Sequence, residues 1–273
     1  MRFVYDKNNT DKNPWARAIH NIVHEQRSNW VQVTIGPPGT GKSSLNLSQA
    51  LMLDKTFAID NTRVAFSVAD FINICRSFDE KRNGRGKVVM LEEVGVVASS
   101  KEWQSSSSRE LSNVLQTFRS QGLILLMSVP DDELFIKDGR RLIKGLFIMK
   151  KLDFEHKTVS CQPFECQHNP RNHKTYFHYL RKKTKRGDVM VDDWTLPMAG
   201  KEDWEKFETM MELYKKSVRD RAVTRLNAET TKMTTPKRKV KCNKCNFSWA
   251  PRDQNSNVPP KCSKCFQKDT VWL

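Results

Sequence analysis

A glycine-rich stretch in the first fifth of the chain has the residue types and the spacing of a phosphate-binding loop. It fits the pattern GxxxxGK[ST] at every fixed position: Gly36, Pro37, Pro38, Gly39, Thr40, Gly41, Lys42 and Ser43. Glycines let the backbone curl so that its N–H groups point at phosphate oxygens, and the helix that follows adds partial positive charge. We expect Lys42 to reach the β- and γ-phosphates of ATP and the Ser43 hydroxyl to ligate Mg²⁺, with Ser44 next to them.

Two acidic residues end an apolar stretch further along the chain. Val88–Leu91 is followed directly by Glu92 and Glu93. Glu92 is expected to organise the Mg²⁺ shell, and Glu93 to act as the general base that orients the attacking water. The first acid of such an element is usually Asp, and Glu92 is one methylene longer. Plain surface charges at a strand end are the alternative interpretation.

A polar residue and an arginine are candidates for contact with the γ-phosphate. Ser128 lies near the end of the apolar stretch 123–129 and is the sensor candidate. Arg119 ends the helix expected just before that stretch and is the first candidate for an arginine finger. Arg109, Arg140 and Arg141 stay open as fingers, and each of these arginines could also be a solvated surface charge.

Four cysteines near the C-terminus have the spacing of a structural zinc site. They form two CxxC pairs separated by sixteen residues: Cys242, Cys245, Cys262 and Cys265. Each pair can bring two thiolates to one Zn²⁺, and two pairs complete a closed tetrahedral shell. Two disulfides or a redox-active pair are the alternatives. Zinc is favoured because the chain carries no secretory signal and the two cysteine pairs have the same spacing.

A second group of metal-ligating residue types is expected to have structural or surface roles instead. Cys161, Cys166, His168, His173 and His178 lie close together in the sequence, but their spacing matches no compact ligand pattern. The remaining cysteine, Cys75, falls on the apolar face of an expected helix, which favours burial in the core.

The elements that must position these residues alternate between strands and helices. Apolar and β-branched runs predict strands at 30–35, 63–68, 87–91, 123–129 and 146–152, and helical periodicity predicts helices at 15–23, 42–53, 69–78 and 109–120. This order predicts an α/β fold, a P-loop NTPase parallel sheet with helices on both faces, plus a small C-terminal zinc ribbon. The run 123–129 is fully apolar and is expected to be central. Beyond it, 158–164 and 174–180 indicate a β-hairpin or an irregular extension.

The expected domain organisation follows from these elements. Residues 1–200 form the P-loop ATPase domain, 201–229 a charged helix, 230–241 a basic linker and 242–273 the zinc ribbon. The ribbon segment is too short to fold on a core of its own, so zinc binding would supply its folding free energy.

The charge balance favours a polyanionic partner. The chain has 47 Lys and Arg against 31 Asp and Glu, a formal net charge of +16. Half of this charge lies in residues 231–273, which have ten Lys and Arg and two Asp, interleaved with Phe247, Trp249 and Trp272. Four thiolates around Zn²⁺ would leave about +6 there. The interleaving suits phosphate contact and base stacking on DNA, and docking of a protein partner is the alternative.

No apolar run approaches the ~20 residues that a membrane-spanning helix needs, so direct membrane insertion is not expected. Residues 1–9 are polar and lack the apolar stretch of a signal peptide. The sequence therefore predicts an intracellular, cytoplasmic protein.

The acidic pair and the residues after it resemble a family. Leu91–Gly95, Ser99–Trp103, Leu115–Arg119, Ser128–Pro130 and Asp138–Arg141 are similar to segments of P-loop ATPases of archaeal viruses and plasmids, which are related to the FtsK–HerA motor class and to zonula-occludens-toxin-like proteins. A Thr is commoner in this family at the position of Ser128. The resemblance covers about residues 30–150. It implies a homo-oligomeric ATPase that forms a ring, with a hexamer as one ring size, and acts on DNA in packaging, transfer or replication of a mobile element. The end of the chain also resembles archaeal zinc ribbons.

Three functions remain to be compared. The first is an ATP-hydrolysing DNA motor, for which Glu93 and Arg119 would be required. The second is a nucleotide-switched loader or regulator that binds DNA with little turnover. A nucleoside or small-molecule kinase is the poorer third, because it would not need a basic zinc module. ATP is favoured over GTP because the chain has no Asn-Lys-x-Asp motif.

Overall fold

The structure, a computed structural model, describes residues 13–81, 83–92, 113, 115–116, 121–129, 141–184, 187–234, 239–251 and 258–272. The chain divides into two compact units, Met1–Glu212 and Leu213–Leu273. The first unit contains an eight-stranded sheet and a separate two-stranded one, and the second contains a three-stranded sheet. Within the described ranges, none of the helices combines the length and the apolar character needed to span a membrane.

The helices and strands follow one another in an order that begins with alternating α and β elements. They are α1 (Pro14–His20), the π-helix η2 (Asn21–Glu25), β1 (Trp30–Ile35), α2 (Lys42–Leu53), β2 (Val64–Ala65), α3 (Val68–Lys81), β3 (Val88–Leu91), β4 (Ile124–Val129), β5 (Gly145–Asp153), β6 (Thr158–Asn169), β7 (Lys174–His178), β8 (Leu180–Thr184), β9 (Gly187–Val191), β10 (Trp194–Pro197), α7 (Lys201–Thr234), β11 (Val240–Cys242), β12 (Ser248–Trp249) and β13 (Thr270–Trp272).

The large sheet has a parallel half and an antiparallel half. Its order is β10-β6-β5-β1-β4-β3-β2, with β7 paired to β6. The strands β5, β1, β4, β3 and β2 run parallel, whereas β6 is antiparallel to β5, β7 and β10. β4 is inserted between β1 and β3 and is buried along its whole length, as expected for a fully apolar strand. The first unit has an α/β fold with a mostly parallel mixed sheet, and the second unit contains a small sheet with a four-cysteine cluster.

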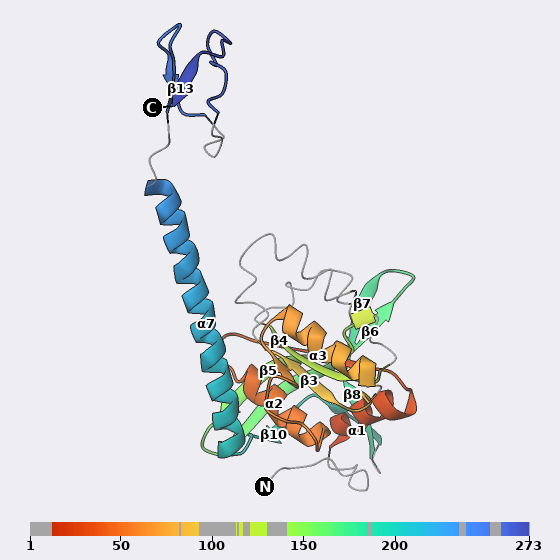
Figure 1. Cartoon of the computed structure of the whole chain (residues 1–273). Helices are drawn as coiled ribbons and strands as arrows, with labels where there is room; N and C mark the ends of the chain where they lie inside the picture. Colours follow the sequence, from red (N-terminus) through yellow and green to blue (C-terminus); the bar gives the residue numbers. More distant parts are fainter. Residues whose placement is uncertain are drawn as a thin grey trace. The chain divides into compact units, whose positions relative to one another are not determined.

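Side chains alternate between the two faces of the sheet, and different helices cover each face (Figure 1). On one face, Val31 and Val33 of β1 join a core cluster with Phe71 and Ile74 of α3. On the other face, α2 packs on β1, β3 and β4. Trp15 of α1 reaches the α2 face, where its ring lies 5.3 Å from that of Phe147 and 6.4 Å from that of Trp194.

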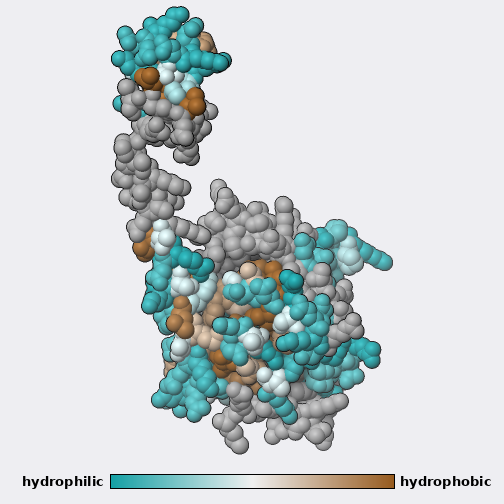
Figure 2. Space-filling model, in the orientation of Figure 1, coloured by the Kyte–Doolittle hydropathy of each residue, from teal (hydrophilic) through white to brown (hydrophobic). Residues whose placement is uncertain are grey.

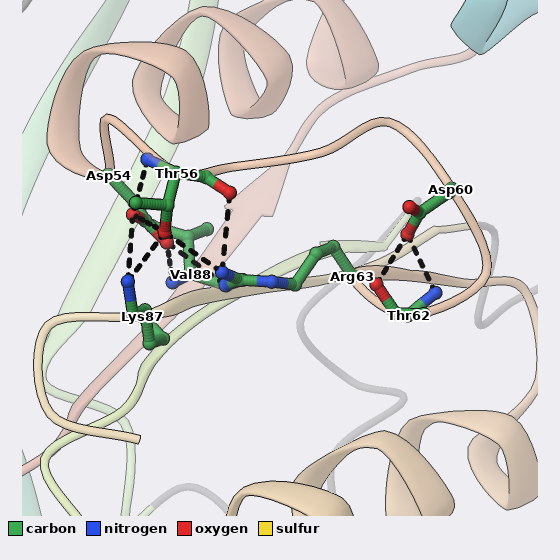
Figure 3. Close-up of polar contacts among 7 residues, drawn as sticks. All are labelled: Asp54, Thr56, Asp60, Thr62, Arg63, Lys87 and Val88. Atoms are coloured by element: carbon green, nitrogen blue, oxygen red, sulfur yellow. Dashed lines mark hydrogen bonds and ion pairs between the residues drawn. The ribbon is translucent and has the colours of Figure 1, made fainter. Parts of the chain in front are cut away.

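A buried ionic cluster lies at the edge of the sheet opposite the loop that follows β1 (Figure 3). Asp54 comes directly after α2, and its carboxylate accepts hydrogen bonds from Arg63 Nη1 at 2.9 Å and from the Val88 N–H at 3.1 Å. Arg63 also donates to the Val88 carbonyl at 2.9 Å. Thr56 donates to Asp54 through its N–H at 2.9 Å, and Lys87 lies 3.8 Å away. The cluster fastens the end of α2 to the starts of β2 and β3.

The elements around the loop at 36–43 lie where the sequence predicts them, and others differ. The predicted strand 63–68 is reduced to the two residues of β2, because Ser67 caps α3: its hydroxyl accepts the N–H of Asp70 at 3.1 Å, and the helix begins at Val68. The predicted hairpin is regular and longer, since β6 runs to Asn169 and joins the main sheet through β5. α7 continues to Thr234, beyond its apolar pattern. The predicted helix 109–120 lies mostly outside the described residues.

Candidate functional site

The glycine-rich loop at 36–41 connects β1 to α2. Gly41 is the N-cap of α2 with φ 91°, a left-handed conformation that favours glycine, and it supplies no side-chain cap to the helix. A Cβ at Gly41 would lie 3.1 Å from Leu152 of β5, so strand and loop are in close contact. The first turn of α2 therefore starts with uncapped N–H groups beside an open loop, the arrangement that binds phosphate in other proteins.

Polar contacts within the loop involve Lys42 and Thr40. Lys42 Nζ donates to the Gly36 carbonyl at 2.6 Å and to the Pro37 carbonyl at 2.9 Å. The Thr40 hydroxyl donates to the same Pro37 carbonyl at 2.7 Å. The ammonium group thus lies inside the curve of the loop, where oxygens of a bound phosphate would replace the Gly36 and Pro37 carbonyl oxygens as its hydrogen-bond partners. Pro37, Pro38 and Gly39 form the exposed tip, and Ser44 is buried in the first turn of α2.

Glu92 follows β3 directly and lies against the start of α2. It is fully buried, and one carboxylate oxygen, Oε2, accepts hydrogen bonds from the hydroxyls of Ser43 at 2.8 Å and Ser128 at 2.5 Å. The other oxygen, Oε1, accepts from Asn46 Nδ2 at 3.3 Å. A hydroxyl and a carboxylate oxygen are the ligands that Mg²⁺ prefers. The residues present therefore fit a magnesium ion held by Ser43 and Glu92.

The topology explains why Ser128 reaches Glu92. β4 lies between β1 and β3, with Thr34 opposite Ser128 and Leu91 opposite Met127, so the ends of the three strands meet at one edge. The sequence suggests Ser128 as a γ-phosphate sensor. In the structure its hydroxyl donates a hydrogen bond to Glu92.

A buried chain of polar side chains leads from Glu92 along the α2 face of β1, and sequence reasoning missed it. Asn46 accepts the Thr34 hydroxyl at 2.7 Å, and Thr34 accepts Gln32 Nε2 at 3.3 Å. Gln32 also donates to Gln49 of α2 and accepts the Trp30 indole N–H at 3.2 Å. The signal was present in the sequence: Gln32 and Thr34 alternate with valines along β1, and Asn46 and Gln49 are three residues apart on α2.

Several predicted site residues lie outside the described part of the chain. These are Glu93, Arg109, Arg119 and Arg140. Arg141 is described, in an exposed turn four residues before β5. The geometry of a general base and of an arginine finger therefore stays a prediction from the sequence.

The four C-terminal cysteines come together in the second unit. Their sulfur atoms all lie within 4.8 Å of one another, with 3.6 Å between Cys242 and Cys265 and between Cys245 and Cys262. Sulfurs about 2.3 Å from a tetrahedral Zn²⁺ are about 3.8 Å apart. The donor set and its spacing fit one zinc ion, which would leave no ligand position for other chemistry.

The two CxxC turns have the same backbone geometry. In the first, the Asn246 N–H donates to the Cys242 carbonyl at 2.9 Å, and in the second the Phe266 N–H donates to the Cys262 carbonyl at the same distance. The residue after each second cysteine is left-handed, with φ 57° at Asn246 and 58° at Phe266. The fold thus presents both pairs to one point in the same way, as expected of a metal site with equivalent halves.

The thiols of this cluster ionise unequally. For Cys262, burial raises the pKa, but hydrogen bonds from the backbone of Cys265 and Lys264 and from neighbouring thiols outweigh it and lower the pKa to about 6. For Cys265, a backbone hydrogen bond from Gln267 lowers the pKa, while burial and the other three thiols raise it to about 12 overall. Four adjacent sulfurs share negative charge poorly without a cation.

The other cysteines are structural. Cys75 is fully buried in the core cluster of α3, as predicted, and burial raises its pKa to about 12. Cys161 is buried on β6, where burial also raises its pKa, and Cys166 packs against the same core cluster as Cys75. Within the described ranges, the four-cysteine cluster is the one group of His, Cys, Asp and Glu arranged to hold a metal ion.

Comparisons with known proteins find similar solved structures. No family model matches the chain, and no curated protein matches it in sequence. The N-terminal domain of zonular occludens toxin from Neisseria meningitidis is 15% identical with a TM-score of 0.34, over 59% of this chain and 100% of that one. The RadB recombinase is 12% identical with a TM-score of 0.33, over 60% of this chain and 92% of that one.

Proposed function

We propose that this protein hydrolyses ATP and works as a DNA motor of a viral or mobile element, in packaging, transfer or replication. The observation that carries the proposal is the contact of the buried Glu92 carboxylate with the Ser43 hydroxyl directly below the phosphate-binding loop. A loop that bound only a phosphate would not need a buried acid at this point. An acid paired with the loop serine is what a magnesium–nucleotide site requires.

The roles of the residues follow from their chemistry. Lys42 and the N–H groups at the start of α2 would bind the phosphates, and Ser43 with Glu92 would hold Mg²⁺. A magnesium ion bound there would neutralise charge that develops on the β- and γ-phosphates. Glu93 would orient water, and Arg119 of the same or a neighbouring subunit would contact the γ-phosphate. Contact by Arg119 of a neighbouring subunit would require a homo-oligomer, as the family resemblance implies.

The zinc ribbon is proposed to contact DNA. Phe247 and Trp249 are stacked with their ring centroids 5.9 Å apart and their planes at 14°, and Lys264 Nζ lies 6.0 Å from the Phe247 ring. An exposed ring, Phe247, stacked on the half-buried Trp249 and lying beside a lysine suits base stacking combined with phosphate contact. A protein partner at the ribbon is the alternative, and it would bind without dependence on an oligonucleotide.

The test is ATP hydrolysis by the purified chain with and without single- and double-stranded DNA. The proposal expects turnover that DNA stimulates and that Lys42→Ala and Glu93→Gln both abolish. Lys55→Ala, at an exposed lysine just after α2, is the matched control and should leave the rate unchanged. Nucleotide binding with no turnover that responds to DNA would contradict the motor and would favour the nucleotide-switched loader.

A further inference from the structure

The net positive charge of the chain is concentrated in two short stretches. Residues 231–273 carry a formal +8, and residues 166–187 carry seven Lys and Arg with no Asp or Glu. The remaining 208 residues have 30 Lys and Arg against 29 Asp and Glu and are therefore almost neutral. A surface that serves only solubility mixes both signs. A run of 22 residues with no acid, in a body that is otherwise balanced, indicates an anionic partner.

We call this run the basic hairpin segment (166–187). Its described residues, 166–184 and 187, form the end of one hairpin and part of the next. The end of β6 pairs with β7, with Cys166 opposite Phe177 and Asn169 opposite Lys174. The β6–β7 hairpin extends away from the helices that cover the sheet (Figure 1). β8 follows and pairs only with β9 among the described strands. Arg171, Lys174 and Arg181 are all exposed.

Two aromatic rings are exposed among these basic residues. Tyr176 is 42% exposed and Phe177 is 52% exposed, and because they are consecutive on β7 they lie on opposite faces of the ribbon. The Tyr176 hydroxyl accepts a hydrogen bond from Asn172 Nδ2 at 2.8 Å. The Phe177 ring lies 6.2 Å from that of Phe164 in an edge-to-face contact. Both rings are thus held in place with part of their area open to solvent.

The visible face of the hairpin is polar. It is mostly hydrophilic in the space-filling view (Figure 2). A protein partner bound through hydrophobic contact would require a larger apolar patch. An exposed ring such as that of Tyr176, among cationic side chains, matches the surfaces that bind single strands, where bases stack on aromatic side chains and cations follow the phosphates.

We propose that the basic hairpin segment binds single-stranded DNA, through phosphate contacts of Arg171, Lys174 and Arg181 and base stacking on Tyr176. This inference depends on the proposed function for the choice of DNA, but it does not depend on ATP hydrolysis. It assigns a DNA contact to the first unit that is separate from the contact proposed for the ribbon.

The test compares two triple variants of the full chain that lose the same charge. The hairpin variant is Arg171→Gln, Lys174→Gln and Arg181→Gln, and the control is Lys55→Gln, Arg76→Gln and Lys81→Gln, three exposed residues of the same unit. Binding is measured by fluorescence anisotropy without nucleotide, on labelled oligodeoxythymidylate of about 30 nucleotides and over a range of salt concentrations. Circular dichroism verifies that each variant is folded.

The hairpin variant should bind at least about tenfold more weakly at physiological salt. Its slope of log affinity against log salt should fall by about 2, because each phosphate contact to a single strand contributes about 0.7. The control should change affinity by less than about twofold. Tyr176→Leu should weaken single-strand binding about tenfold and leave binding to a duplex of the same length unchanged.

Three results would overturn the inference, and they differ in what they say of the proposed function. If the wild type binds DNA and the two triple variants bind it equally, the inference alone fails. If Tyr176→Leu does not change single-strand binding and the hairpin variant loses as much affinity for a duplex as for a single strand, the assignment to single strands fails. If the wild type binds no DNA, the DNA part of the proposed function fails too, and DNA-independent ATP hydrolysis would show whether the enzyme assignment stands.

Discussion

Replacing Arg63 should destabilise the first unit far more than replacing the neighbouring Lys87, although both cations face the same carboxylate. The Arg63 side chain is 8% exposed and lies 2.9 Å from Asp54, whereas Lys87 is 27% exposed and lies 3.8 Å away. Methionine is the replacement in both cases, because it keeps most of the aliphatic packing and removes the charge.

The expected cost of Arg63→Met is about 3 kcal/mol of unfolding free energy. Removing one partner of a buried ion pair costs about 3–5 kcal/mol, because it leaves an uncompensated charge. Asp54 keeps its hydrogen bonds from Thr56 and from the Val88 N–H, which favours the lower end. The variant also loses the cation–π contact between the Arg63 guanidinium carbon and the Phe78 ring, whose centroid lies 4.9 Å away, and this adds ~0.5–1 kcal/mol to the cost. Lys87→Met should cost under about 1 kcal/mol, as for exposed pairs.

Urea unfolding followed by tryptophan fluorescence measures both variants, because Trp15, Trp30 and Trp194 are buried in this unit. In an Asp54→Asn background the cost of Arg63→Met should fall to about 1 kcal/mol, since no buried charge is then left unpaired. The reasoning would be refuted if Arg63→Met and Lys87→Met cost the same, or if the Asp54→Asn background did not reduce the cost of Arg63→Met.

Three further outcomes follow from the same geometry. Burial raises the pKa of Asp54, but hydrogen bonds from Thr56 and Val88 and the charge of Arg63 outweigh it, so the pKa lies below its ordinary 3.8. The stability that Asp54 contributes is present above pH 3.8 and is lost as the pH falls through the lowered pKa. Asp54→Asn should therefore flatten this part of the curve of unfolding free energy against pH. Asn46→Leu leaves Glu92 and Thr34 each one hydrogen bond short, so calorimetry should find a loss of about 1–3 kcal/mol of stability. In ATP hydrolysis the same variant should lower kcat more than it lowers nucleotide affinity, and an unchanged kcat would contradict a positioning role for Asn46. Metal analysis should find one zinc per chain. Cys262→Ser or a chelator should remove the zinc and unfold the second unit, while the near-ultraviolet circular dichroism of the buried tryptophans in the first unit stays unchanged. A second unit that stays folded without metal would refute the zinc site.

The parts of the fold that the sequence predicts best are those that a motif delimits. β1 and α2 begin and end where predicted, because the loop glycines terminate one element and start the other. β2 was overextended because its apolar residues continue into Phe66, while the cap at Ser67 and Asp70, legible in the sequence, decides where α3 begins. In the antiparallel half of the sheet, the β6–β7 hairpin was predicted as one of two possibilities, but the pairing of β6 with β5 and β10 was not, since it depends on contacts between distant segments.

The candidate site was predicted in its parts but not in its connections. The P-loop and Glu92 are visible as motifs, yet the contact between Ser43 and Glu92 requires β4 to lie between β1 and β3, and no local pattern specifies strand order. The four cysteines were predicted as a set because their ligand spacing is itself local. Asn46 and Thr34 were missed because the alternation of polar residues with valines in β1 does not say which helix residues they meet, and this is known only once the helix packs on the strand.

The polar chain from Trp30 to Glu92 links the stability of the packing between α2 and the sheet to the position of the Glu92 carboxylate. Gln32, Thr34, Asn46 and Gln49 occupy the interface between α2 and the sheet, where matched apolar residues would pack at no cost in desolvation. Replacing all four together by aliphatic side chains of similar volume should cost less stability than the four single replacements added together, because most of the hydrogen bonds join the four residues to one another. The cost that remains comes from the two ends, where the buried Trp30 indole N–H and Glu92 Oε1 lose their partners. Each member of the chain is therefore costly to lose alone, and its end at Glu92 couples the packing of α2 to the position of that carboxylate.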